Sequence, residues 1–146
     1  MAHAGRATRE RGLLGEAGRA VRRLHDAGVA HADLHPKNLL RDGVGRVLIL
    51  DLDKAFDGSG TLSDEMRLRN LVRLGRAVEK HRMKGLRAGR REALRFLEGY
   101  AGDRDAAVEW LERVGTRLRR GLRWRMIWWR LTGEARPWRP RAPAAG

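Results

Sequence analysis

The sequence predicts a mostly α-helical domain that carries one small β-hairpin. Apolar side chains recur at helical spacing over most of the chain, and a single Asp-Gly turn separates two short apolar runs. The length of 146 residues suits one domain. Because a lone hairpin cannot form the centre of such a domain, we expect it to lie on a bundle of helices, with its two flanking loops at one edge.

The helices are predicted from apolar residues three and four positions apart. The first covers residues 10–27, where Leu14, Ala17, Val21 and Leu24 form the stripe and Gly28 ends the helix. Three more helices are predicted later in the chain, over residues 64–82, 90–100 and 106–131. Ser63 or Asp64 is the candidate N-cap of the second helix.

The hairpin is predicted from residues 39–40 and 46–50, joined by the turn at 42–45. Polar loops, 29–38 and 51–63, flank it on either side. We assign residues 1–133 to one domain and residues 134–146 to a basic, proline-containing, irregular tail.

The composition limits the partners and the compartment. The formal net charge of +14 favours anionic partners such as nucleic acid, phosphate-bearing substrates or an anionic membrane, although a preference for Arg codons explains part of it. The absence of cysteine excludes disulfides and thiolate metal sites. With no signal-peptide pattern and no apolar run long enough to span a bilayer, we expect a cytoplasmic location.

The candidate chemistry lies in the two loops beside the hairpin. Asn38 follows Asp33 by five positions and Asp51 follows Asp33 by eighteen. These spacings match the catalytic loop of kinases and their later metal-binding aspartate. Phosphoryl transfer needs a carboxylate to orient the attacking hydroxyl and accept its proton, which is the role predicted for Asp33. It also needs hard oxygen ligands for Mg²⁺, which Asn38 and Asp51 would supply.

Other residues near these loops have weaker signals. His31 is interpreted as a structural histidine. Asp53, where protein kinases have glycine, is either a second acidic neighbour of the metal or a solvated carboxylate. Taken singly, Asp and Asn in loops are usually turn formers, so only the joint spacing supports the chemistry.

Residues 28–40, Gly-Val-Ala-His-Ala-Asp-Leu-His-Pro-Lys-Asn-Leu-Leu, and residues 48–54, Leu-Ile-Leu-Asp-Leu-Asp-Lys, resemble the lipopolysaccharide kinase family. They are most similar to the kinases of 3-deoxy-D-manno-octulosonic acid (Kdo). Histidine at position 35 distinguishes the chain from protein kinases, and the acidic residue at 53 and the segment 69–80 favour Kdo kinases over other small-molecule kinases. The similarity covers roughly residues 15–100.

The resemblance implies the C-terminal lobe of the protein-kinase-like fold, with a catalytic loop at 31–38 and a metal loop at 51–53. It implies ATP and Mg²⁺ as cofactors and a Kdo-lipid A type glycolipid as the acceptor, and it places His35 and Lys37 near the transferred phosphate. A whole kinase also has an N-terminal lobe with a Gly-rich loop and a strand lysine. Only about thirty residues precede the catalytic loop here, so we expect that lobe to be absent and this chain alone to be incomplete.

The C-terminal end has two open interpretations. Residues 117–146 contain nine Arg and one Glu, with Trp124, Trp128, Trp129 and Trp138 among them. Such a pattern suits an anionic membrane interface, which would place the protein peripherally on the inner face of the inner membrane. Alternatively, the helix packs inward and closes the domain. Nucleic acid is a less favoured partner, because no reader motif is present.

Two other functions remain as alternatives at this point. One is a small-molecule kinase similar to aminoglycoside or choline phosphotransferases. The other is a kinase-lobe remnant without catalytic activity that binds a membrane or a partner.

Overall fold

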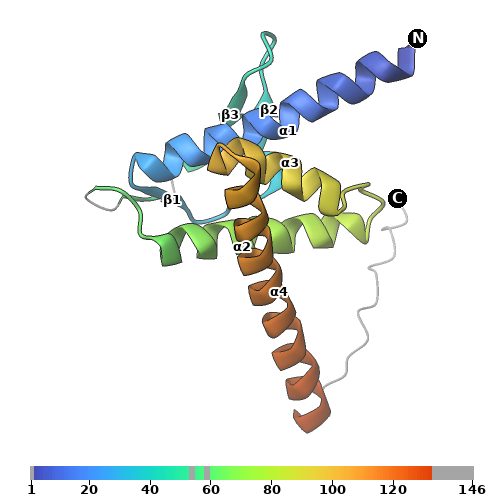
Figure 1. Ribbon diagram of the computed structural model, residues 1–146. Coiled ribbons are helices and arrows are strands. Elements are labelled where there is room, and N and C mark those ends of the chain that lie inside the picture. The colour runs from blue at the N-terminus through green and yellow to red at the C-terminus, as the bar shows by residue number, and fades with distance from the viewer. Residues whose placement is uncertain (1, 53–54, 58–59, 133–146) are drawn as a thin grey trace, which may run out of the picture.

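The computed structural model describes the backbone of residues 2–52, 55–57 and 60–132, and the side chains of residues 12–52 and 60–121. Within these ranges the chain forms four α-helices, a short 3₁₀ helix and two small antiparallel sheets (Figure 1). The elements, in chain order, are α1 Ala2–Asp26, β1 Val29–His31, η1 Pro36–Asn38, β2 Leu39–Arg41, β3 Val47–Ile49, β4 Ala55–Asp57, α2 Asp64–Arg82, α3 Arg90–Ala101 and α4 Arg104–Thr132. The prediction of a mostly helical chain with a small hairpin is therefore confirmed.

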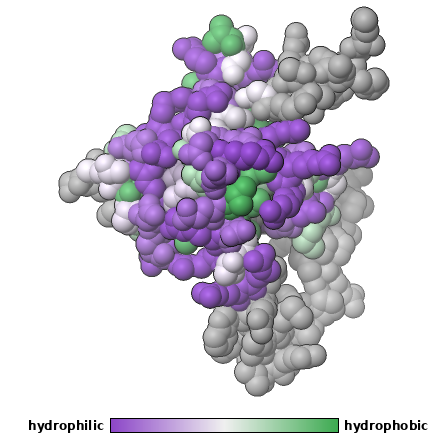
Figure 2. Space-filling model, viewed as in Figure 1, coloured by the Kyte–Doolittle hydropathy of each residue, from purple (hydrophilic) through white to green (hydrophobic). Residues whose placement is uncertain are grey.

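Helix α2 begins and ends where the sequence predicts. The hydroxyl of Ser63 accepts a hydrogen bond from the amide of Met66, which satisfies one free donor of the first turn. Acidic residues occupy the first turn and basic residues the last, which complements the helix dipole. The apolar stripe faces inward, with Leu68, Leu71 and Leu74 all buried. The face of the molecule in Figure 2 is correspondingly largely hydrophilic over the described residues.

Helices α1 and α3 cross at very short range beneath the hairpin (Figure 1). Glycine makes this approach possible. A Cβ atom at Gly18 would overlap the backbone carbonyl of Phe96, and one at Gly99 would overlap the backbone of Gly15. The buried core continues from this contact through Val21, Leu34 and Tyr100 to α2 and α4.

The β2–β3 hairpin lies on α1. Its register pairs Leu39 with Ile49 and Leu40 with Leu48, and Val47 packs against Ala17 and Ala20 of α1. Alternation along the strands then turns Leu40 and Leu48 to the outer face, where 51% and 45% of their surface is exposed. The hairpin is thus held on one face only.

A second sheet was not predicted. Residues 29–31 and 55–57 were both assigned to loops, but they form β1 and β4, which pair antiparallel with Ala30 opposite Phe56. Each strand has three residues, so neither shows a periodic pattern that could reveal it. This small sheet closes the loop that contains the hairpin.

Helix α4 crosses α2 and projects beyond it (Figure 1). Its first half packs inward, with Val114 buried and Leu111 and Leu118 against the core, as the closing-helix interpretation predicts. The side chains of Trp124, Trp128 and Trp129, and the whole predicted tail 134–146, lie outside the described residues. No helix in the described part of the chain is long and apolar enough to cross a membrane.

Candidate functional site

The two polar loops meet at the base of the hairpin, as the spacing predicts. The side-chain amide of Asn38 donates to the backbone carbonyl of Asp33 at 3.0 Å, which closes the loop 31–38 on itself. The carbonyl of Asn38 accepts from the amide of Leu50 at 2.9 Å. This bond extends the β2–β3 ladder by one step and places the first loop beside the residue that precedes Asp51.

His31 links the same two loops through its ring. It is fully buried, and its Nδ1 accepts from the amide of Asp33 at 3.0 Å. Nε2 is then the protonated nitrogen and donates to the carbonyl of Leu50 at 2.8 Å. The ring therefore fixes the backbone on both sides of the site, in agreement with the structural role predicted for it.

Asp33 is exposed and faces His35. Its side chain is 54% accessible, and one carboxylate oxygen lies 3.5 Å from Nε2 of His35. Nδ1 of His35 accepts from the amide of Lys37 at 3.2 Å and so caps the 3₁₀ helix η1. Because Nδ1 of His35 is the acceptor, Nε2 is the nitrogen that bears the hydrogen and faces Asp33. Lys37 is exposed on the same turn.

Asp51 has an unusual backbone. It has a φ of 61° and is the one non-glycine residue with a positive φ among the residues that the structure describes. Such conformations are costly and cluster at functional sites, where the surrounding structure maintains them. Here the flanking residue Leu50 is held by both Asn38 and His31. Asp53, the candidate second acidic neighbour, lies outside the described residues.

A buried polar network supports the loops from behind, and the sequence interpretation missed it. The amide of Asn70 in α2 donates to the carbonyl of His31 at 2.7 Å, and its oxygen accepts from the amide of His31 at 3.1 Å. The same oxygen lies 3.0 Å from Nε2 of His25, whose Nδ1 lies 2.8 Å from the hydroxyl of Tyr100. The only available signal was a polar residue, Asn70, on the apolar stripe of α2.

Burial sets the protonation state of His25 in this network. Because His25 is fully buried, the pKa of its ring is lowered from 6.5 to about 4, and the nearby Arg67 guanidinium acts in the same direction. The ring is therefore neutral at neutral pH. In that state, Nε2–H donates to Asn70, and Nδ1 accepts from the hydroxyl of Tyr100.

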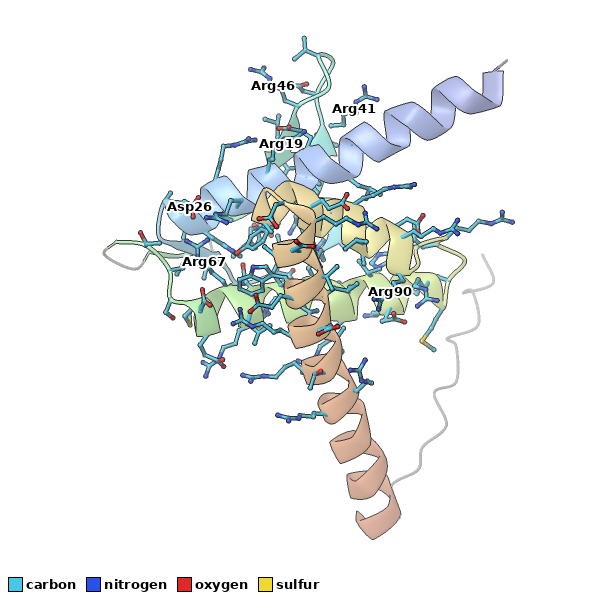
Figure 3. All side chains as sticks on the ribbon, viewed as in Figure 1. Arg19, Asp26, Arg41, Arg46, Arg67 and Arg90 are labelled. Carbon is cyan, nitrogen blue, oxygen red and sulfur yellow. The ribbon has the colours of Figure 1, made fainter. Side chains whose placement is uncertain are left out.

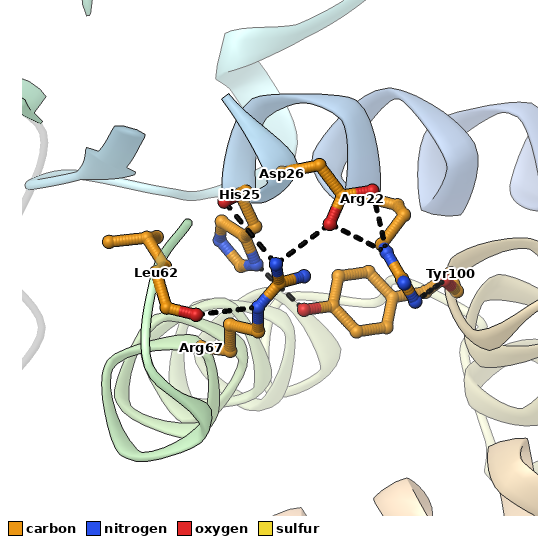
Figure 4. Close-up of polar contacts among 6 residues, drawn as sticks. All are labelled: Arg22, His25, Asp26, Leu62, Arg67 and Tyr100. Atoms are coloured by element: carbon orange, nitrogen blue, oxygen red, sulfur yellow. Dashed lines mark hydrogen bonds and ion pairs between the residues drawn. The ribbon is translucent and has the colours of Figure 1, made fainter. Parts of the chain in front are cut away.

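Arg67 fastens α2 to the end of α1, where the chain enters β1 (Figure 4). The guanidinium is almost fully buried and donates to the carbonyl of Leu62 at 3.0 Å and to the Asp26 carboxylate at 2.7 Å. Burial alone would raise the pKa of Asp26, but the hydrogen bonds from Arg67 and Arg22 outweigh it and lower that pKa. Asp26 thus stays ionised and keeps the pair intact at neutral pH.

The two loops offer oxygen donors of the kind that Mg²⁺ binds. No group of three His, Cys, Asp or Glu side chains gathers within the described residues, which exclude Asp53. Mg²⁺ usually takes one or two carboxylates and completes its shell with water and substrate phosphates. The exposed carboxylate of Asp51 and the side-chain oxygen of Asn38, whose nitrogen is already engaged, suit that pattern.

Comparison with known proteins identifies the family. The sequence model of the Lipopolysaccharide kinase (Kdo/WaaP) family matches residues 2–100. The chain belongs to this family. Three similar relatives each carry the name 3-deoxy-D-manno-octulosonic acid kinase: those of Vibrio cholerae serotype O1, 43% identical over 63 residues; Stenotrophomonas maltophilia, 40% over 67; and Actinobacillus succinogenes, 35% over 85.

These matches with Kdo kinases are partial on both sides. They cover 43%, 46% and 56% of this chain but only 26%, 26% and 31% of the respective relatives. The chain therefore spans about a quarter to a third of the length of the Kdo kinases that it matches. No solved structure matches it.

Proposed function

We propose that this chain forms the C-terminal lobe of an ATP- and Mg²⁺-dependent kinase that phosphorylates the Kdo sugar of the lipopolysaccharide inner core. The observation that carries the proposal is the joining of the Asp33 loop to the Asp51 loop through His31 and Asn38, in a member of the Kdo/WaaP family. We assign residues 1–133 to this lobe and residues 134–146 to a separate tail.

Asp33 is assigned as the general base. Its carboxylate is exposed to solvent, while its backbone is held by His31 and Asn38, so the side chain can approach a sugar hydroxyl without moving the loop. The oxygen that faces His35 at 3.5 Å leaves the other oxygen to take the proton. We assign His35 and Lys37 to the neighbourhood of the transferred phosphate.

Asn38 and Asp51 are assigned as ligands of Mg²⁺. The ion would bridge the phosphates of the nucleotide and neutralise the charge that develops on them. Beside these residues, Leu40 and Leu48 form an exposed apolar pair on the outer face of the hairpin. An apolar surface next to a phosphate site suits the base of ATP.

The acceptor is proposed to be a Kdo-lipid A type glycolipid, because the relatives are named as Kdo kinases. A substrate of this kind lies in a membrane, so the protein would work in the cytoplasm and bind peripherally to the inner face of the inner membrane. The net charge of +14 is consistent with binding to an anionic membrane surface.

The experiment is a chimera. The segment of the Vibrio cholerae relative that matches this chain is replaced by the corresponding residues of this chain, and phosphate transfer from ATP to Kdo-lipid A is measured. We expect activity, and we expect Asp33→Asn to lower kcat by about 10²–10⁴-fold, the usual contribution of a general base. Asp51→Asn should raise the Mg²⁺ concentration needed for half-maximal rate.

Three outcomes would count against the proposal. A folded chimera that binds ATP without transferring phosphate to Kdo contradicts the function, and transfer to an aminoglycoside or choline instead would favour a small-molecule kinase. Near-normal turnover of Asp33→Asn excludes Asp33 as the base. If the chimera does not fold, Mn²⁺ can be titrated into the 146-residue chain. We then expect selective broadening of the NMR signals of Asn38 and Asp51. The absence of such broadening would contradict the metal assignment.

A further inference from the structure

The connection between α2 and α3 is a concentrated basic surface. Residues 80–91 contain six Lys or Arg and no acidic residue. All six are exposed. Of these six, only Arg82 forms an ion pair with a residue that the structure describes, Glu79 at 2.8 Å. The six, which we call the α2–α3 basic surface, are Lys80, Arg82, Lys84, Arg87, Arg90 and Arg91.

Two apolar side chains stand out from this basic surface. Met83 is 85% exposed and Leu86 is 44% exposed. They are presented by a closed turn, in which the amides of Lys84 and Leu86 both donate to the carbonyl of His81, at 2.9 and 3.1 Å. Gly85, at a φ of 99°, allows the chain to reverse there. The turn therefore holds Met83 and Leu86 outward instead of letting them fold back.

A shallow hollow of about 400 Å³ adjoins the turn and is lined by Met83, Leu86 and Ala88 together with Arg82, Arg87 and Glu79. Because Glu79 is paired with Arg82, the two arginines leave the rim of the hollow with a net positive charge. A phosphate-bearing headgroup could rest against this rim, with its apolar chain beside Met83 and Leu86.

We propose that the α2–α3 basic surface, with Met83 and Leu86, docks the protein on a bilayer that contains anionic phospholipid. Lysine and arginine attract the headgroups, and the aliphatic tips enter the interface between headgroups and acyl chains. Nucleic acid fits less well, because single strands are bound by stacking on aromatic side chains and residues 80–91 contain no Phe, Tyr or Trp. The proposal rests on the membrane location proposed above and adds the surface that makes contact.

Because the chain has no cysteine, a single environment-sensitive dye can be placed at will. We would label Met83→Cys, and as a control Val44→Cys at the tip of the hairpin, which is 78% exposed. Vesicles of phosphatidylcholine containing phosphatidylglycerol should shift the emission of the dye at position 83 to the blue and leave the dye at position 44 unchanged. Pure phosphatidylcholine vesicles should shift neither. Equal shifts at both positions, or no shift at position 83 whether or not the vesicles bind the chain, would overturn the proposal.

The charge contribution is tested with matched triple variants. Replacing Lys84, Arg87 and Arg90 with Gln should weaken binding to the anionic vesicles at least about tenfold. The control replaces Arg19, Arg41 and Arg46 with Gln. These three lie around α1 and the hairpin, away from Arg90 (Figure 3). It removes the same charge and should weaken binding far less. Equal weakening by both triples would mean that only net charge matters and would refute the docking surface.

Two further outcomes separate the alternatives. Met83→Ser combined with Leu86→Ser should weaken vesicle binding and leave binding to a short DNA duplex unchanged. If the double variant binds vesicles like the parent chain while the Gln triple loses duplex binding, the surface is a nucleic-acid site and the proposal is wrong. Vesicle binding does not depend on phosphate transfer, so an inactive chimera would leave this result standing.

Discussion

The side-chain amide of Asn70 makes two hydrogen bonds with the backbone of His31, one to its carbonyl and one from its amide, at 2.7 and 3.1 Å. The two residues are 39 positions apart, and both are buried. Since the ring of His31 in turn holds Asp33 and Leu50, α2 positions the candidate catalytic loop and metal loop together. Helix α2 therefore supports the site through Asn70.

Asn70→Leu is expected to destabilise the protein by at least about 3 kcal/mol. Leucine leaves the amide and carbonyl of His31 and the Nε2–H of His25 buried without partners, and each such group costs about 1–3 kcal/mol. Urea unfolding followed by circular dichroism measures the loss. The control is Arg73→Leu, an exposed position one turn away on the same helix, which should change stability by less than about 0.5 kcal/mol. Equal stability of the two variants would show that the network contributes nothing.

The buried His25 predicts a pH dependence of stability. Its folded pKa of about 4 lies below the unfolded value of 6.5, so between these values the unfolded chain binds more protons than the folded one. The contribution of His25 is therefore complete above pH 6.5 and is lost as the pH falls toward 4. The loss is of the order of 3 kcal/mol, at 1.36 kcal/mol per pKa unit.

The measurement is the free energy of unfolding at a series of pH values, for the parent chain and for His25→Gln. The groups that face His25 are Tyr100, Arg67, Asp26 and Arg22, besides the neutral Asn70. Asp26, whose pKa is lowered below 3.8, titrates below this window. We therefore expect His25→Gln to flatten the slope between pH 6.5 and 4. An unchanged slope would assign the dependence to another group.

Gly18→Ala and Gly99→Ala should each destabilise the protein by at least about 2 kcal/mol, because the added methyl meets rigid backbone of the facing helix. Gly12 offers a matched control in the same helix α1, since a Cβ atom there has nothing within 4 Å. Gly12→Ala should stabilise by about 0.5–1 kcal/mol through helix propensity. Thermal unfolding of the three variants tests whether the α1–α3 crossing is as close as described.

The parts of the fold that were predictable from sequence are those with local signals. Helix α2 has a capping serine, acidic first and basic last turns and a regular apolar stripe, so its predicted limits 64–82 agree with the structure. The Asp-Gly turn similarly located the hairpin. Helix α1 was predicted to begin at residue 10 but begins at Ala2, because residues 2–9 have no apolar periodicity to indicate a helix.

The parts that were missed depend on contacts between distant residues. Strands β1 and β4 are too short to show alternation and are defined only by pairing with each other. In the site, the spacing of Asp33, Asn38 and Asp51 predicted the meeting of the two loops, because it matches the kinase pattern and the hairpin between the loops brings them side by side. The roles of Asn70, His25 and Tyr100 arise from three helices packed together, and no spacing rule connects them.

The last prediction concerns the C-terminal end. Residues 122–146 contain six Arg and one Glu, with four Trp among them. Arginine near an anionic surface contributes about 1 kcal/mol and acts within a Debye length of about 8–10 Å, so the net charge of +5 would contribute several kcal/mol even when only part of it engages. Truncation after Gly121 should therefore weaken binding to anionic vesicles strongly. In the parent chain, high salt should reduce binding without abolishing it, because salt screens the arginine charges but not the burial of indole rings. Tryptophan emission should shift to the blue on vesicles, because the indole rings leave water.

Unshifted emission with complete loss of binding in salt would make this end a simple polycation. A truncated chain that unfolds, together with a parent chain that ignores vesicles, would instead assign these tryptophans to the core of the domain.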